Sequence, residues 1–446
     1  MKKIYILATI FIFIIVSFIY TFQNSQSKIS IKIKTLFPDE VKFIMKDVVT
    51  FYLSNFNLNI NFVKRDSIES SNGKKYLIRE YNSKFFDLKG PRAYLDSDDN
   101  NLFVVTGTGL VTFSSINDFF SEKNFSLKTV DTNIKDLVTY KDFHYDSSYG
   151  VKGILVDKNH IFISIINRTN DIDECYNISI LKSKINLDKL NFSYIFKPKE
   201  CVKKDNIYGE FQALQSGGML SKFDNNNLLL SIGDFRFRDL AQNDQSIYGK
   251  LLTVNKKNGN YKIISKGHRN PQGLHYDSVA KIIVSTDHGP MGGDEVNIDK
   301  DIYDKSNFGW PISSYGEHYV EKEETYKKAP LHKSHAKYGF VEPVKYFTPS
   351  IGISQIVKAE NSFGQYNNHN YFLSSLGFIT GPYSGRINSL SLHQIVFDQD
   401  YSNIIYEDRI RLNQRIRDII FIPEKKIIVG FLEKKGSIII LSDYEQ

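Results

Sequence analysis

The chain is poor in cysteine and has no long run of one charge sign, and both shortages exclude classes of protein. It contains only two cysteines in 446 residues, Cys175 and Cys201, and neither belongs to a Cys-x-x-Cys pair of the kind that binds a metal. Its formal net charge is +7, but lysine and arginine alternate with acidic residues along the chain. The sequence therefore does not predict nucleic-acid binding.

Sustained helical periodicity is scarce after the N-terminus, which disfavours an α-helical protein. Hydrophobic residues make up 41% of the chain and aromatic residues 14%, enough for a large globular core. The high aromatic share, with abundant isoleucine, valine and threonine, is typical of β-structure.

The N-terminus carries a long apolar run. Lys2 and Lys3 precede residues 4–22, an uncharged apolar stretch of about 19 residues that is long enough to cross ~30 Å of hydrocarbon as a helix. We expect residues 1–22 to be a single-pass anchor in a bacterial inner membrane, with the bulk of the chain in the periplasm. A cleaved signal peptide, which would leave a soluble periplasmic protein, is the alternative.

Residues 23–87 form a predicted membrane-proximal segment whose function cannot be inferred from its sequence. Within it, Ser71-Asn72-Gly73 lies between two apolar stretches and predicts a hairpin turn.

Further along the chain, Cys175 and Cys201 lie in one polar stretch. In an oxidising compartment we expect them to form a disulfide, the alternative being two unrelated thiols.

One pattern recurs from residue 88 to the C-terminus. A turn rich in Asp, Asn or Lys leads into a short apolar run, and copies follow one another at intervals of roughly 55 to 90 residues. The runs are residues 102–106, 161–164, 228–231, 282–285, 371–374 and 427–430. An aspartate precedes four of them, at the position of an Asx-type turn: Asp98, Asp157, Asp224 and Asp277. Six such units predict an all-β fold, a six-bladed β-propeller over residues 88–446.

The most distinctive stretch lies in the middle of this region. It reads Gly267-His268-Arg269-Asn270-Pro271-Gln272-Gly273, then His288-Gly289-Pro290-x-Gly292-Gly293-Asp294-Glu295-x-Asn297, then Asn307-Phe308-Gly309-Trp310-Pro311. In order and spacing these motifs closely resemble the soluble quinoprotein glucose dehydrogenase family, which includes the aldose sugar dehydrogenases and the glucose/sorbosone dehydrogenase domain. The resemblance implies a six-bladed propeller that binds pyrroloquinoline quinone (PQQ) and calcium and oxidises a small sugar or alcohol in the periplasm.

The resemblance also implies roles for individual residues. Arg269 and Asn270 match the family's contacts to the quinone oxygens, and Gln272 lies in the same turn. Arg415 and Arg417 match its late arginine pair, which grips the cofactor, as suits guanidinium groups facing carboxylates. Backbone carbonyls of Gly289 and Pro290 match the ligands of the catalytic calcium, a hard ion that prefers oxygen. Glu295 matches a residue at a second calcium in some members.

The sequence departs from the family at the catalytic base. Leu214 occupies the place of the histidine that removes the substrate proton, and leucine cannot accept a proton. Val151 and Gly377 replace a glutamine and a lysine that help to hold the quinone. His144 is the first candidate for a replacement base.

Two functions therefore remain open. One is a PQQ- and calcium-dependent sugar or alcohol dehydrogenase with an altered base, its electron acceptor unknown. The other is a catalytically inactive, membrane-tethered propeller that acts as a binding or interaction module.

Overall fold

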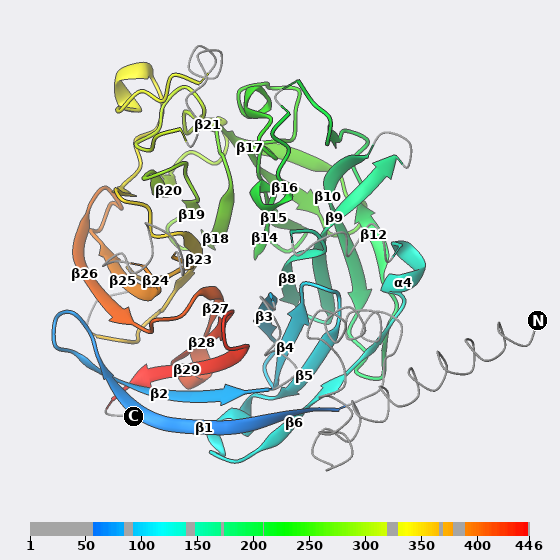
Figure 1. Cartoon of the computed structure of the whole chain (residues 1–446), viewed down its shortest axis with the longest axis vertical. Helices are drawn as coiled ribbons and strands as arrows, with labels where there is room; N and C mark the ends of the chain where they lie inside the picture. Colours follow the sequence, from blue (N-terminus) through cyan, green and yellow to red (C-terminus); the bar gives the residue numbers. More distant parts are fainter. Residues whose placement is uncertain are drawn as a thin grey trace, which may run out of the picture.

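The computed structural model describes residues 57–83, 92–139, 148–170, 174–207, 209–318, 329–364, 369–377 and 389–444. Over these residues the fold is all-β and propeller-like, with sheets arranged around a common centre (Figure 1). Helices are short and lie in connections. They are η1 (Ile116–Phe120), α4 (Ile134–Leu137), η2 (Ala213–Gln215), η3 (Arg238–Ala241), η4 (Ala336–Tyr338) and η5 (Pro423–Lys425).

Four sheets are built mainly from antiparallel strands that follow one another along the chain. The first contains β8 (Val151–Asp157), β9 (His160–Asn170), β10 (Cys175–Lys184) and β12 (Ser193–Phe196), with β13 (Val202–Lys203) beside β10. The second contains β14 (Gly217–Lys222), β15 (Asn227–Ile232), β16 (Lys250–Asn255) and β17 (Tyr261–Lys266), extended by β21 (Ser306–Asn307). The third contains β18 (Pro271–Asp277), β19 (Ile282–Asp287), β20 (Asp294–Asp299) and β22 (Lys345–Phe347). The fourth contains β23 (Ile353–Lys358), β24 (Asn370–Ser375), β25 (Ser391–Phe397) and β26 (Ile404–Arg411).

A nine-stranded sheet joins the two ends of the described chain. Its strands are, in spatial order, β27 (Ile416–Ile422), β28 (Ile427–Leu432), β29 (Ser437–Asp443), β2 (Lys75–Asn82), β1 (Asn57–Glu69), β6 (Phe125–Thr129), β5 (Val111–Ser115), β4 (Asn101–Thr106) and β3 (Ala93–Ser97). A separate two-stranded ribbon pairs β7 (Asp131–Thr132) with β11 (Lys189–Leu190). β2 pairs with β29 from Tyr76 opposite Asp443 to Asn82 opposite Ser437, so an early strand closes the sheet of the last ones (Figure 1).

The predicted hairpin turn at residues 71–73 is confirmed, because it connects the antiparallel strands β1 and β2. The sequence grouped these strands with the membrane-proximal segment 23–87. In the structure they belong to the same sheet as the C-terminal strands. Their apolar side chains pack in the shared core, as Tyr81, which is fully buried, shows.

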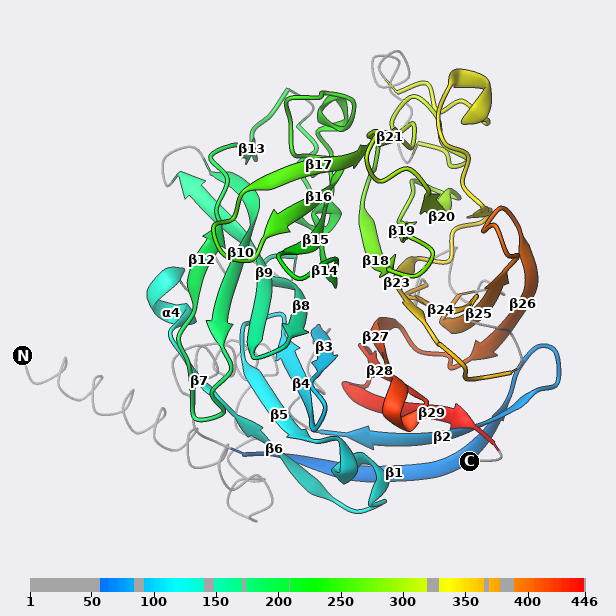
Figure 2. The same ribbon diagram turned by 180° about the vertical axis from the view of Figure 1, so that it is seen from behind.

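Each of the four sheets described first places its earliest strand at the centre of the molecule, and the nine-stranded sheet places both of its edge strands, β3 and β27, there. β3, β8, β14, β18, β23 and β27 contact one another in turn and close into a ring (Figure 2). These strands pack closely where they begin: a Cβ atom on Gly153 of β8 would lie 2.7 Å from the Gly218 oxygen of β14. The starts of the inner strands therefore lie together at one end of the ring, and their final residues lie at the other.

All of the predicted apolar runs lie in strands, and these are the second strands, next to the inner ring: β4, β9, β15, β19, β24 and β28. Three of the predicted aspartate turns form as expected. Asp98, Asp224 and Asp277 each accept hydrogen bonds from backbone amides two and three residues ahead. Asp157 instead forms an ion pair with Lys256 at 2.6 Å.

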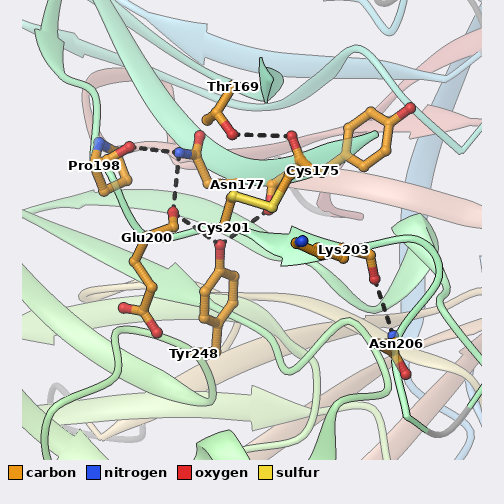
Figure 3. The surroundings of a disulfide bond; sticks show 10 residues. Thr169, Cys175, Asn177, Pro198, Glu200, Cys201, Lys203, Asn206 and Tyr248 are labelled. Atoms are coloured by element: carbon orange, nitrogen blue, oxygen red, sulfur yellow. Dashed lines mark hydrogen bonds between the residues drawn. A yellow bond between two sulfur atoms is a disulfide. The ribbon is translucent and has the colours of Figure 1, made fainter. Parts of the chain in front are cut away.

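The predicted disulfide is confirmed. Cys175, the first residue of β10, is bonded to Cys201, and their Cα atoms lie 5.4 Å apart (Figure 3). Around it, the Asn177 side chain donates to the carbonyl oxygens of Pro198 and Glu200, and the Tyr248 hydroxyl also donates to Glu200 (Figure 3). The bond closes a loop with a sequence separation of 26 residues. Restricting such a loop in the unfolded chain stabilises the fold by about 3 to 4 kcal/mol.

The predicted membrane anchor, residues 1–22, lies outside the described residues, as does most of the segment up to residue 56. Within the described part of the chain, no helix is both long enough and apolar enough to cross a bilayer. The anchor therefore stays a prediction from sequence.

Candidate cofactor site

The Arg-Asn turn that precedes β18 is fixed by one buried carboxylate. Asp287, the last residue of β19, accepts the backbone amide of Arg269 at 3.0 Å and that of Asn270 at 2.7 Å. The His268 ring lies 3.4 Å from the same carboxylate. Because β18 and β19 are paired neighbours, the sheet itself brings Asp287 beneath the turn. Both side chains of the Arg-Asn pair therefore start from a fixed backbone.

Asn270 connects the turn to the neighbouring inner strand. Its side-chain oxygen accepts the Gly217 amide of β14 at 3.1 Å and the Gln272 side-chain amide at 3.0 Å. Gln272 in turn accepts from the Arg417 guanidinium of β27 at 3.4 Å. The structure thus brings Asn270, Gln272 and Arg417 together as the sequence predicted, although 145 residues separate Gln272 from Arg417.

Arg269 lies against the glycine-rich turn that follows β19. Its Nη1 atom donates to the carbonyl oxygens of His288 at 2.6 Å and Gly289 at 2.7 Å. Its guanidinium lies 5.4 Å from the centre of the Trp310 ring. The Trp310 indole donates to Asp234 at 2.8 Å. Burial raises the pKa of the Asp234 carboxyl, and the Arg269 charge partly opposes that rise.

Arg415 and Arg417 share a single carboxylate, that of Glu433 at the end of β28. Arg415 Nε and Arg417 Nη2 each lie 2.7 Å from one of its oxygens. Burial raises the pKa of Glu433, but the two arginines outweigh this effect and lower it from 4.5 to about 2. The sequence did not reveal Glu433, because it lies in a turn of charged residues that resembles any solvated turn.

The carbonyl oxygens of the glycine turn are already engaged within the chain. Gly289 O accepts from Arg269, while Pro290 O accepts from the Gly293 amide at 3.1 Å and the Ser350 hydroxyl at 3.2 Å. Asp294 holds the turn by accepting the Gly289 amide. The described residues also contain no group of three or more His, Cys, Asp or Glu side chains suited to a metal. As they lie, these residues do not form a calcium cage.

Glu295 lies beside His335, and its place at a second calcium stays a prediction. Its Oε1 atom lies 3.3 Å from His335 Nε2, and its Oε2 atom accepts from the Asn297 amide at 3.3 Å. Burial raises the Glu295 pKa, and the neighbouring His335 ring partly opposes this rise. The His335 ring also stacks on Tyr315. Sequence reasoning missed His335, which lies 40 residues beyond Glu295 in a long connection.

Leu214 lies in the short helix η2, close to the Arg-Asn turn. Its side chain is 45% exposed, whereas Ala213 and Gln215 on either side are buried. Gln215 accepts from Arg236 Nε at 2.5 Å, and Gly217, three residues after Leu214, contacts Asn270. Leu214 thus presents an apolar side chain to solvent at the edge of the site.

Packing surrounds Val151 and Gly377, the two other positions where the sequence predicts a departure from the family. Val151 is fully buried in the core cluster that β8 shares with its neighbours. Gly377 has φ +54°, and a Cβ atom there would lie 2.8 Å from that of Ser389, so a lysine does not fit without rearrangement. Its carbonyl oxygen accepts from Arg415 at 2.8 Å. His144 lies outside the described residues.

The model of the family described as Glucose / Sorbosone dehydrogenase matches residues 119–440, more than half of the chain. The chain belongs to this family. Its predicted resemblance is thereby confirmed, and with it the all-β, propeller-like fold. The site assembled around Arg269 occupies the motif region on which the resemblance rested.

Two curated relatives match part of the chain. An uncharacterized protein of Synechocystis is 26% identical over 246 residues, which cover 50% of this chain and 55% of that protein. Aldose sugar dehydrogenase YliI of Escherichia coli is 28% identical over 151 residues, which cover 31% of this chain and 38% of the relative. The chain thus aligns with only about half of the length of these relatives or less.

Solved structures show the same fold over most of the chain. The soluble aldose sugar dehydrogenase of Escherichia coli, in its apo-form, superposes with a TM-score of 0.60 at 18% identity, over 86% of this chain and 99% of that one. The PQQ-bound aldose sugar dehydrogenase of Streptomyces coelicolor superposes with a TM-score of 0.54 at 13% identity, over 86% and 97%. At these identities the likeness concerns the fold alone.

The shared carboxylate generates a prediction about stability. Replacing Glu433 by glutamine leaves two adjacent, largely buried arginines without a counter-charge, so Glu433→Gln should lower the free energy of unfolding by about 3 kcal/mol at neutral pH. Folding lowers the pKa of Glu433 from 4.5 to about 2. The stabilisation is therefore present above pH 4.5 and is lost as the pH falls towards 2.

Urea unfolding near neutral pH and at about pH 3.5 measures this effect. The difference in the free energy of unfolding between wild type and Glu433→Gln should shrink at the lower pH. Glu424→Gln, an exposed glutamate in the turn before β28, is the matched control and should change little. Equal stability of wild type and Glu433→Gln at neutral pH would show that the ion pairs of Glu433 with Arg415 and Arg417 do not stabilise the fold.

Proposed function

We propose that the chain is a PQQ-dependent sugar or alcohol dehydrogenase-like protein whose usual histidine base is replaced by Leu214. The observation that carries the proposal is the convergence of Arg269, Asn270, Gln272 and Arg417 from separate parts of the chain. Family membership and the PQQ-bound structural neighbour support it. We also propose that the ring comprises six blades, since six inner strands each begin a unit of four.

The residues present fit an anionic cofactor. Arg415 and Arg417 share one carboxylate, so the trio with Glu433 keeps an excess positive charge. PQQ carries three carboxylates and an ortho-quinone, and guanidinium groups bind carboxylates with two parallel hydrogen bonds. The side-chain amides of Asn270 and Gln272 add hydrogen-bonding groups beside the arginines. Calcium remains a prediction from the resemblance.

On this proposal Arg415 and Arg417 would hold cofactor carboxylates, and Arg269 and Asn270 would contact the quinone oxygens. When bound, PQQ supplies a two-electron acceptor for a sugar or alcohol carbon. Arg269 stays charged and oriented because carbonyl oxygens and the Trp310 ring surround it. Leu214 can shape the entrance but cannot accept the substrate proton, which removes a contribution of ~10²- to 10⁴-fold in rate.

An inactive binding or interaction module is the second candidate. The observation that favours it is the combination of Leu214 with a buried Val151 and a Gly377 that leaves no room for a side chain. In that case the arginine network would persist as a scaffold or as a ligand-binding site. The two candidates differ in whether the site turns over a substrate.

We place the protein, as a proposal, in the periplasm, attached to the inner membrane through residues 1–22. The basis is the apolar run after Lys2 and Lys3, together with a disulfide that suits an oxidising compartment. Fractionation of the native host should recover the chain with the inner membrane and release it with detergent. A mature chain beginning near residue 25 in the soluble periplasmic fraction would overturn the anchor.

Cofactor binding is the first test. We expect the purified protein to bind PQQ in an absorbance titration, and Arg417→Gln to weaken binding roughly tenfold or more by removing a charge-assisted contact. Arg411→Gln, an exposed arginine at the end of β26, should bind like wild type. Thermal unfolding of each variant confirms that it is folded. If PQQ does not bind at concentrations on the order of tens of micromolar, with or without calcium, the cofactor proposal is overturned. The inactive binding or interaction module is then the candidate that remains.

The missing base gives the second test. Leu214→His should create or raise dye-linked sugar dehydrogenase activity by ~10²-fold or more if only the base was lost. Leu214→Gln is the matched control, because it is polar and similar in length but is not a base. No gain in a Leu214→His protein shown to hold PQQ would contradict a defect limited to the base.

A further inference from the structure

A second polar pocket lies between two neighbouring sheets, away from the candidate cofactor site. It has a volume of about 370 Å³ and is lined by the β8–β9 turn, the β14–β15 turn and the β16–β17 turn, with one side chain from β10. Its charged lining consists of four lysines, Lys158, Lys182, Lys256 and Lys257, against one aspartate, Asp157. His160 and several asparagines complete it.

This pocket lies at the opposite end of the inner ring from Arg269. β8 begins at Val151, beside the start of β14, where Gly217 contacts Asn270. It ends at Asp157, which lines the pocket. A seven-residue strand spans about 20 Å. The pocket is therefore separate from the proposed oxidation site.

Among the residues that the structure describes, three of the four pocket lysines have no carboxylate partner. Lys256 is the exception and pairs with Asp157 at 2.6 Å. Lys182 donates to the Lys256 carbonyl oxygen at 2.8 Å and lies over the Phe162 ring. Lys158 donates to the Asn225 side-chain oxygen at 3.2 Å. Among the residues that the structure describes, the Lys257 ammonium has no hydrogen-bond or ion-pair partner.

The titrating groups of the pocket report the same excess of positive charge. Burial lowers the pKa of Lys182, and the neighbouring Lys256 charge lowers it further. Burial likewise lowers the pKa of His160, with additional contributions from Lys182 and Lys184 that outweigh the opposing effect of Asp157. Cations held close together in a hollow repel one another, and a bound anion would relieve that repulsion.

We propose that this pocket binds a phosphate group. A phosphate monoester carries about −1.5 to −2 charges at neutral pH and presents three acceptor oxygens. Three lysines without a carboxylate partner among the described residues line the pocket from three different elements and supply the opposite charge. Lysine binds phosphate as a point charge and needs no planar geometry. A single carboxylate would neutralise only one of the three.

The phosphate could belong to a free solute or to a lipid headgroup, and the experiment separates the two. Inorganic phosphate is titrated into the full chain in detergent, with binding followed by calorimetry and by the NMR signal of His160. The pocket variant is Lys158→Gln/Lys182→Gln/Lys257→Gln. The matched control, Lys135→Gln/Lys281→Gln/Lys337→Gln, removes the same charge from exposed sites outside the pocket.

Wild type and the control should show saturable binding and a rise in the pKa of His160. The pocket variant should bind at least roughly tenfold more weakly. No saturable binding by wild type, or equal weakening in the control, would overturn the proposal.

In a second arm, vesicles of phosphatidylcholine with and without phosphatidylglycerol are compared. Loss of the phosphatidylglycerol dependence in the pocket variant alone assigns the site to a lipid headgroup, whereas phosphate binding without that loss assigns it to a soluble phosphate.

Discussion

The backbone pairing of β2 with β29 is the constraint on which the rest of the structure depends. The inner strands converge on one axis only if the ring is closed, and this ladder ties an early strand to the last one. β27 begins just after Arg415, so closure also sets where the two late arginines lie. Within the closed ring, Arg417 of β27 donates to the Gln272 side chain of β18 at 3.4 Å.

Three buried carboxylates then convert this frame into a site. Asp287 and Asp294 accept backbone amides of the two motif turns and so fix their shapes, while Glu433 orients two arginines. A buried charge is tolerated only when it is paired or well hydrogen-bonded, and each of these groups satisfies that condition. The same arrangement leaves more positive than negative charge around Arg415 and Arg417, which suits an anionic ligand.

If Leu214 stands in place of the base, as the sequence predicts, scaffold and chemistry have separated in this fold. Leu214 is nearly half exposed, and the buried neighbours Ala213 and Gln215 hold the helix η2 in place. Because the side chain at 214 contributes little to the core, the fold tolerates a leucine or a histidine there at little cost in stability. The arginine network, by contrast, is buried and interconnected, so its loss would be felt in folding as well as in binding. The presence of these arginines is therefore weaker evidence of catalysis than the presence of a histidine base would be.

The sequence by itself determined the features that depend on local chemistry. Apolar runs predicted strands, the Ser71-Asn72-Gly73 turn predicted a hairpin, and three aspartates predicted the turns that they form, because each depends on residues a few positions apart. The motif spacing was enough to identify the family, and the polar stretch around Cys175 and Cys201 predicted their disulfide.

Only the tertiary structure decided that β1 and β2 belong to the closing sheet, that Glu433 holds both late arginines and that Glu295 faces His335. Each of these depends on partners far apart in the chain, and no local pattern distinguishes such a residue from a solvated charge.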